Sequence, residues 1–299
     1  MKKTVAQGIL LTVACLFALS LPGQGYTEVA SAFTEYFPLK TGAETFPGSR
    51  SGLNALIPFA IRKEKENYLL AGANVEFIRF GHAPESFGVD RFYGISPVLG
   101  YTESISGRWK ITAILSPFWN SDFKTGGGNA LRFAGFARLA RQLNESFSWR
   151  ITAGYRQQYF GPHYILLAGI DWQAGERWRL FGDLPQNFTV AYGVSARVRA
   201  GLGLVANLMS YHISGLRRYF RYSYAHAGPF VEYNLFKNIV LRGDIDYSFT
   251  RKYEVYYEGD KSDATLIFFR IGEKPAPVSS PLEKGVVLRA SLSYRVSNN

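Results

Sequence analysis

The sequence is poor in cysteine and in charged residues, and these shortages exclude several classes of protein. Its 299 residues include a single cysteine, so a disulfide-stabilised scaffold is excluded. Charged residues make up 19%, less than the roughly 25% of an ordinary soluble domain, which argues against a disordered chain. After the N-terminus there is no run of about 20 apolar residues, so we expect no transmembrane helix in the mature protein.

The N-terminus has the three parts of a secretory signal peptide. Lys2 and Lys3 form a positive start, an apolar run covers 8–21, and small residues follow at 23–25. We therefore predict that residues 1–25 are removed on export. Cleavage after Ala32 is the alternative. Either cut also removes Cys15, so the mature chain suits an oxidising compartment without using a disulfide.

Alternation of apolar and polar residues dominates the rest of the chain. Apolar residues occupy the even positions from Val286 to Val296, whereas Arg289, Ser291, Ser293 and Arg295 occupy odd ones. Segments 130–140, 146–157 and 239–250 repeat the pattern. Successive side chains of a strand point to opposite faces, so each segment predicts a strand with one apolar and one polar face.

Such strands fit either a soluble periplasmic β-sandwich or an outer-membrane β-barrel. Three features favour the barrel: strands of about 11–13 residues rather than about 5–6, a polar face rich in Arg, Ser, Thr and Gly, and connections that alternate between short and long. We predict an all-β protein, an antiparallel transmembrane β-barrel of about 12–14 strands, with 10 as the lower bound. The barrel covers 51–299, and segment 26–50 is a candidate for its first strand.

Tryptophans follow three of the predicted short turns. Trp109, Trp149 and Trp178 each lie on the apolar face within about three residues of a turn, and Tyr294 holds a comparable place near the C-terminus. Aromatic rings with a polar edge prefer the membrane–water boundary. We therefore expect these four residues to form a membrane-interface girdle.

Several scattered motifs resemble a known family. They are Pro117, Ser121, Asp122 and Phe123 after one strand, then Gly154-Tyr155, Gly161-Pro162, Gly169, Trp172, Trp178, Asp183-Leu184-Pro185 and Tyr192, and a late Tyr-rich segment with Arg251-Lys252-Tyr253. The chain resembles an uncharacterised family of Gram-negative outer-membrane-type β-barrels, catalogued as a domain of unknown function. Membership implies a barrel in the outer membrane, inserted by the outer-membrane assembly machinery, and implies no reaction. The chain departs from many such barrels by ending on Asn299 rather than on an aromatic residue.

The polar face of the strands predicts a charged lumen. The basic residues expected there are Lys110, Arg132, Arg138, Arg150, Arg156, Arg199, Arg242 and Arg289, and the acidic ones are Glu76, Asp171, Glu232, Asp244 and Asp246. Rings of arginine would give a passive pore for small anionic solutes. Arginine paired with carboxylate would instead give a structural, surface-binding barrel with a salt-bridged lumen. Partners are then membrane lipid and a solute. Nucleic acid is not expected, because the basic residues do not form one patch.

Catalytic motifs are weak. Gly201–Ala206 matches a dinucleotide fingerprint by letters only, since no helix follows. Four histidines show no metal-site spacing, so neither cofactor nor metal is expected. Ser210 and His212 share one face of a strand, which keeps an outer-membrane lipid hydrolase as the alternative function. Without a Gly-x-Ser-x-Gly elbow we assign no catalytic residue and predict a non-enzymatic protein.

Overall fold

The computed structural model describes residues 26–41, 44–62, 66–81, 88–124, 130–279 and 282–297. The predicted signal peptide lies outside these residues. The strands are β1 (Tyr26–Thr41), β2 (Glu44–Arg62), β3 (Asn67–Phe80), β4 (Arg91–Ser106), β5 (Trp109–Ser121), β6 (Leu131–Asn144), β7 (Phe147–Gln158), β8 (Gly161–Ala174), β9 (Trp178–Leu184), β10 (Asn187–Gly193), β11 (Val198–Ile213), β12 (Arg218–Phe236), β13 (Ile239–Tyr257), β14 (Ala264–Leu266), β15 (Phe269–Ile271) and β16 (Leu282–Ser297).

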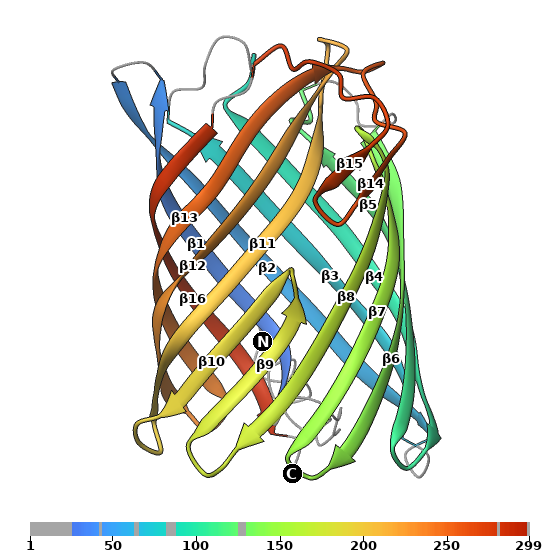
Figure 1. The fold of residues 1–299 in the computed structure, drawn as a ribbon, viewed down its shortest axis with the longest axis vertical. Coiled ribbons are helices and arrows are strands. Elements are labelled where there is room, and N and C mark those ends of the chain that lie inside the picture. The colour runs from blue at the N-terminus through green and yellow to red at the C-terminus, as the bar shows by residue number, and fades with distance from the viewer. Residues whose placement is uncertain are drawn as a thin grey trace, which may run out of the picture.

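Fourteen of these strands, β1–β13 and β16, close into one antiparallel barrel (Figure 1). Each barrel strand pairs with its neighbour in sequence, and β16 joins β13 to β1. The pairing of β8 with β9 completes the ring. The prediction of an antiparallel barrel with 12–14 strands is therefore confirmed. Segment 26–50 supplies β1, which pairs with β16 on one side and β2 on the other.

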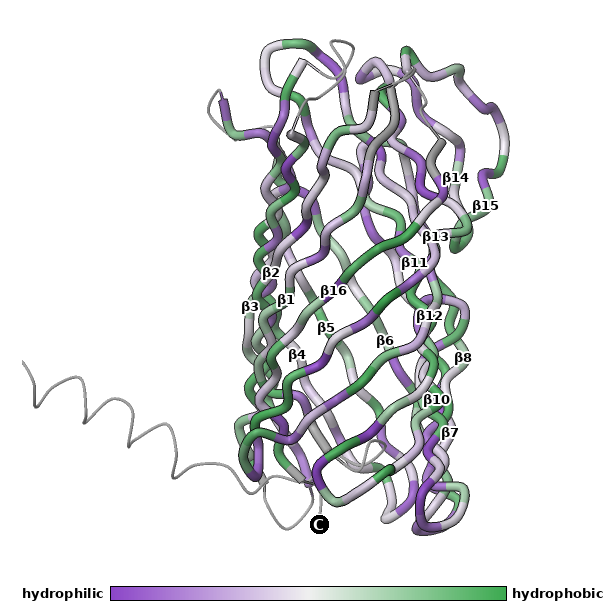
Figure 2. Tube along the Cα trace, turned by 90° about the vertical axis from the view of Figure 1, so that its left-hand side faces the viewer, coloured by the Kyte–Doolittle hydropathy of each residue, from purple (hydrophilic) through white to green (hydrophobic). Residues whose placement is uncertain are grey.

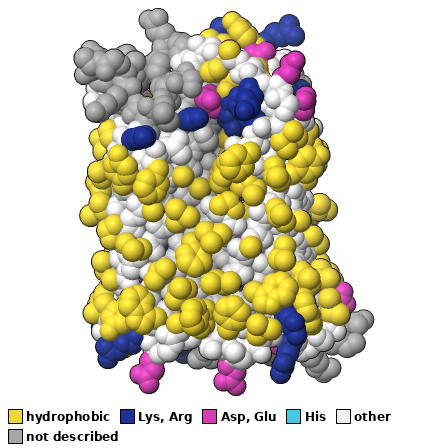
Figure 3. Space-filling model, in the orientation of Figure 1, with side chains coloured by type: hydrophobic (Ala, Val, Ile, Leu, Met, Phe, Trp, Pro, Cys, Tyr) yellow, Lys and Arg dark blue, Asp and Glu magenta, His cyan; other side chains and the backbone are white. Residues whose placement is uncertain are grey.

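The barrel is apolar outside and polar inside for much of its height. Hydrophobic and hydrophilic residues alternate along the strands (Figure 2). The outward-facing side chains include Leu115, Leu202 and Ile245, which are 68%, 62% and 60% exposed. On the face shown in Figure 3, apolar side chains cover most of the height of the barrel, and charged side chains lie towards its two ends. Large apolar surface this extensive is stable in contact with hydrocarbon rather than water.

The connections differ between the two ends. At one end, here called the short-turn end, the links are residues 107–108, 145–146, 175–177, 194–197 and 237–238. The other, the long-loop end, carries the links 81–90, 122–130, 214–217 and 258–281. The links 159–160 and 185–186 break the rhythm of short and long connections, because both are tight turns on the side of the long loops.

The barrel wall is shorter at β9 and β10 than at the other strands. Strands β9 and β10 have only 7 residues each, so they pair with β8 and β11 near the short-turn end alone. Above them the β14–β15 hairpin fills part of the gap and makes a parallel bridge to β8 (Figure 1). Strand β13 continues to Tyr257, and the hairpin that follows folds back against the wall.

Candidate functional site in the lumen

The half of the lumen nearer the long-loop end is filled by side chains. We call this cluster the aromatic plug. It consists of Phe37, Ile78, Phe80, Val89, Phe92, Tyr211, Ile213, Phe220, Tyr222, Tyr224, Tyr253, Val255 and Val287. The members come from β1, β3, β4, β11, β12, β13 and β16 and from Val89 in the link before β4, so the cluster joins strands that are not neighbours in the ring. Each is at most 5% exposed, so the plug excludes water.

Ring stacking gives the plug its order. The rings of Phe92 and Phe220 stack with centroids 4.5 Å apart and planes 9° apart. Tyr222 stacks on Tyr253 at 5.2 Å and 7°, and Phe80 meets Tyr253 edge-on at 5.5 Å. Such pairs stabilise beyond the burial of their area, by about 0.5–1.5 kcal/mol each. The plug is therefore a packed core and not a loose constriction.

The end of β11 crosses the lumen to reach β5. His212 and Ser121 are partners in a parallel bridge, although their strands are far apart around the barrel. The Asn120 amide nitrogen donates to the Ser210 carbonyl at 3.1 Å, and the Ser214 backbone nitrogen donates to the Asp122 carboxylate at 3.0 Å. A ring of fourteen strands would otherwise leave room for water. This crossing narrows the barrel to a width that aromatic side chains can fill.

The half nearer the short-turn end contains cavities between buried side chains. Asn74 points inward and is exposed, and the inward-facing Ser31 and Ser291 are half-buried, whereas Tyr68 and Leu70 are 3% exposed. A cavity of about 310 Å³ lies there between β1, β9–β11, β13 and β16, and its basic lining residues are Arg242, Arg289 and Arg295. A second cavity, of about 380 Å³, borders the plug near Glu76, Arg156 and Tyr211. Some inward-facing residues of this half are therefore solvated, whereas every residue of the plug is buried.

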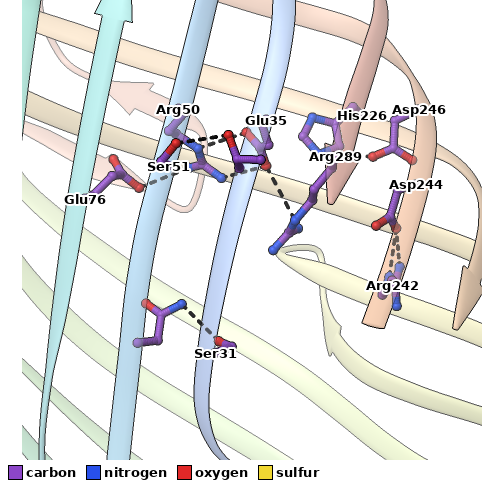
Figure 4. A network of polar contacts seen from close by, with 12 residues as sticks. Ser31, Glu35, Arg50, Ser51, Glu76, His226, Arg242, Asp244, Asp246 and Arg289 are labelled. Carbon is purple, nitrogen blue, oxygen red and sulfur yellow. Dashed lines mark hydrogen bonds and ion pairs between the residues drawn. The ribbon is translucent and has the colours of Figure 1, made fainter. Parts of the chain in front are cut away.

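A buried ion-pair network lines the wall between plug and cavity (Figure 4). The Arg50 guanidinium binds both oxygens of Glu35 at 2.9 Å and one oxygen of Glu76 at 3.2 Å. Arg289 approaches Glu35 at 3.8 Å. Glu35 is 1% exposed and Arg50 4%, and charges buried this deeply require partners. The hydroxyl group of Tyr211 donates to Glu76 and joins this network to the plug.

A second network is centred on Glu232. Its carboxylate contacts Arg295 at 3.0 Å, Arg199 at 3.1 Å and Arg242 at 3.6 Å. Arg242 also pairs with Asp244 at 2.5 Å. These residues come from β11, β12, β13 and β16, whose inward positions share one level of the barrel. Arginines here hold neighbouring strands to a common carboxylate.

The remaining inward residues form smaller groups. Asp183 binds Arg150 at 2.6 Å and Arg138 at 3.5 Å. The other contacts are Asp171 with Arg179 at 2.7 Å, Lys110 with Glu66 at 2.5 Å, Asp246 with His226 at 3.5 Å, and the guanidinium groups of Arg132 and Arg156 over the rings of Tyr159 and Phe136 at 4.3 and 5.8 Å. The structure thus places every predicted lumen residue on the inner side, in several separate groups.

Sequence reasoning missed important members of these groups. Glu35 and Arg50 fall in segment 26–50, which the sequence offered only as a candidate first strand, so its inward residues were not assigned. Asp183 lies at the end of β9, beside a turn. The clearest missed feature is the plug, whose signal was the run of aromatics in segment 218–224 facing another in 253–257. Alternation assigns such residues to faces, but it does not reveal which face is packed against the opposite wall.

The four predicted girdle residues lie on the outer face beside the short turns. Trp109 and Trp149 meet edge-on at 5.6 Å, and Trp178 packs on Tyr192 at 4.9 Å. The Asn238 amide donates to the Tyr294 hydroxyl at 3.2 Å. An interfacial role for these residues remains a prediction.

Ser210 and His212 do not form a nucleophile–base pair. The Ser210 hydroxyl donates to the Gln158 side-chain oxygen at 2.6 Å and accepts the Tyr159 backbone N–H at 3.0 Å. The His212 ring instead packs on the Tyr159 ring, with centroids 5.7 Å apart. Ser210 is 0% exposed, so substrate would not reach it. The geometry gives the lipid-hydrolase alternative no support.

We expect Ser210→Ala and His212→Ala to leave fatty-acid release from phospholipid vesicles at the background rate of the wild type. The reason is that the hydroxyl already has two partners and a base must come within hydrogen-bond reach of its nucleophile. Fatty-acid release would be measured with purified protein in mixed micelles. Release well above background by the wild type that either substitution abolishes would restore the enzyme hypothesis.

Among the residues that the structure describes, no group of three or more His, Cys, Asp and Glu side chains could hold a metal ion. Within the same residues, no helix is long and apolar enough to cross a bilayer.

The chain is similar to one protein family and to several solved structures. A family described as a domain of unknown function (DUF6268) matches residues 65–263. No curated protein matches the sequence. An outer-membrane channel from Pseudomonas putida F1 is similar at 8% identity and a TM-score of 0.47, over 93% of this chain and 98% of that one. The Pseudomonas putida toluene transporter TodX gives 11% and 0.42, over 93% and 91%.

Proposed function

The chain belongs to the DUF6268 family of unknown function, and we propose that it is an outer-membrane channel with a resting closed state. Its lumen contains two cavities beside the arginine networks and is filled by the aromatic plug towards the long-loop end. The observation that carries this proposal is the contrast between these cavities, where the inward-facing Asn74 is exposed, and the plug, where Phe92 and Val287 are 0% and 1% exposed. A purely structural barrel has no need of such cavities.

The apolar belt and the unequal ends support the location. Outer-membrane barrels have short periplasmic turns, longer outer loops and an outward apolar band. We therefore place the short-turn end in the periplasm and the plug near the cell surface. Tyr26, the first residue of β1, and Ser297, the last of β16, pair at the short-turn end, as this orientation requires.

The arrangement of charge favours a salt-bridged lumen over free rings of arginine. Most inward arginines contact a carboxylate, so their charge is largely compensated. The cavity of about 310 Å³ differs in its lining, which contains Arg242, Arg289 and Arg295 but a single acid, Glu28. Each arginine also contacts a carboxylate beside the cavity. Three guanidinium groups gathered at one cavity support a preference for small anionic solutes at that point.

Thiol labelling of single-cysteine variants tests the proposal. The only cysteine lies within the predicted signal peptide, so the exported chain offers no background thiol. In detergent-purified protein we expect Asn74→Cys to react readily with a water-soluble thiol reagent. Val287→Cys should react about a hundredfold more slowly, equivalent to about 2.7 kcal/mol of opening free energy.

Val287→Cys is close in size to the native residue, and Phe249→Cys, on the outer face, controls for detergent shielding. Anionic reagents should outpace cationic ones of the same size at Ser291→Cys, which adjoins the arginine-lined cavity. Equal rates at positions 74 and 287 would show that the plug does not seal the lumen. Rates near zero at both would indicate a solid barrel without a channel.

A further inference from the structure

A third pocket lies outside the lumen, beside the β14–β15 hairpin and above the short strands β9 and β10. It occupies about 550 Å³ between the β14–β15 hairpin and the outward faces of β11, β12 and β13. Its lining combines apolar residues, among them Leu208, Phe268 and Phe269, with Arg221, Lys252, Glu254, Arg270 and Lys274. Of its lining residues, Tyr224 alone also belongs to the plug.

The hairpin that covers this pocket is firmly attached to the barrel. The Ile267 backbone N–H donates to the Tyr164 carbonyl at 2.8 Å, and the Ser262 N–H donates to the Phe160 carbonyl at 2.9 Å. Yet the outer side of the hairpin is apolar, since Phe269, Ile271 and Leu266 are 73%, 51% and 41% exposed. A fixed hairpin with this surface belongs against hydrocarbon, so its pocket opens beside the acyl chains of the bilayer.

The pocket carries more positive charge than its own acid can neutralise. Arg221 contacts the Glu254 carboxylate at 2.8 Å and Arg270 contacts it at 3.2 Å, so two guanidinium groups share one carboxylate. Lys252 and Lys274 are exposed, and no ion pair is recorded for either among the described residues. Two cationic groups therefore remain available to an anion from outside.

The side chain of Arg221 has a hydrogen-bond donor without an acceptor. It is 6% exposed, and its Nε atom is buried without a hydrogen-bond partner. A buried donor left without an acceptor costs about 1–3 kcal/mol, more when the group is charged. The guanidinium also lies over the Phe160 ring at 5.1 Å, so this side chain is held in place at the pocket. An anionic oxygen would satisfy it.

We propose that this pocket binds a lipid of net negative charge from the surrounding leaflet through its phosphate group. Arginine forks match the oxygens of phosphate, and lysines add charge. The apolar residues around Leu208 and Phe268 accept the first part of an acyl chain. The proposal needs the barrel to lie in a membrane but does not depend on the plug or on conduction.

Native mass spectrometry of the full exported chain tests the proposal. The protein is released from micelles containing equal amounts of phosphatidylglycerol and phosphatidylcholine with the same acyl chains. We expect the wild type to retain phosphatidylglycerol in preference to phosphatidylcholine. Lys252→Gln/Lys274→Gln should lower the retained amount about tenfold, as expected for losing one or two charge-assisted contacts.

The matched control is Lys237→Gln/Lys261→Gln, which removes the same charge from exposed positions outside the pocket and should retain as much lipid as the wild type. Equal retention by Lys252→Gln/Lys274→Gln, or no preference between the two lipids, would overturn the proposal. Binding of inorganic phosphate without any retained lipid would also overturn it, by assigning the pocket to a soluble anion.

Discussion

Replacing Phe92 and Phe220 by alanine is expected to convert the closed barrel into one with long-lived open states in planar bilayers. Phe92 belongs to β4 and Phe220 to β12, which are not neighbours in the ring, and the two rings stack on each other inside the lumen. Each truncation removes about 3–5 kcal/mol of packing from the plug. The wild type should open rarely, whereas the variant should give stable current steps. Current is measured at fixed voltage after insertion of purified protein.

The matched control is Phe133→Ala/Phe249→Ala, which removes two phenylalanines from the outer face, where the side chains are 55% and 51% exposed. This variant should conduct as the wild type does. If Phe92→Ala/Phe220→Ala also stays silent while its barrel remains folded, the lumen is blocked by more than the plug. If the wild type already conducts steadily, the plug does not close the channel.

Arg50→Met should destabilise the barrel more than any other single substitution of a lumen arginine. It leaves Glu35 and Glu76 facing each other across β2 with their shared cation removed. Breaking a buried ion pair by removing one partner costs about 3–5 kcal/mol. Arg50 also covers the rings of Phe33 and Tyr224 at 5.0 and 4.7 Å, so packing is lost as well. Urea unfolding in phospholipid vesicles measures the difference.

Two controls separate charge from packing. Arg108→Met removes an exposed arginine in a short turn and should change stability by less than about 0.5 kcal/mol. Adding Glu35→Gln and Glu76→Gln to Arg50→Met should recover part of the loss, because it removes the uncompensated carboxylates. A cost for Arg50→Met no greater than for Arg108→Met would mean that water already screens this network.

The sequence by itself determined the fold class, the apolar outside and the inward side of each strand. These follow from the period of two that strands keep apart from local bulges, such as the one between Ser248 and Arg251. The short turns and the faces of Arg150, Asp244 and Arg289 could therefore be predicted. The sequence also marks 176–183 and 187–195 as short of the about 9–11 residues that a spanning strand needs, and the structure has strands of 7 residues there.

Only the tertiary structure decided whether the lumen is open, which charges pair and what covers the low wall. The plug forms because the end of β11 crosses to β5, a contact between strands that alternation cannot relate. Glu232 gathers Arg199, Arg242 and Arg295 because the stagger of four strands brings distant positions to one level. The β14–β15 hairpin lies against β8 because β9 and β10 end early. Register and strand ends depend on long-range pairing, which local sequence does not encode.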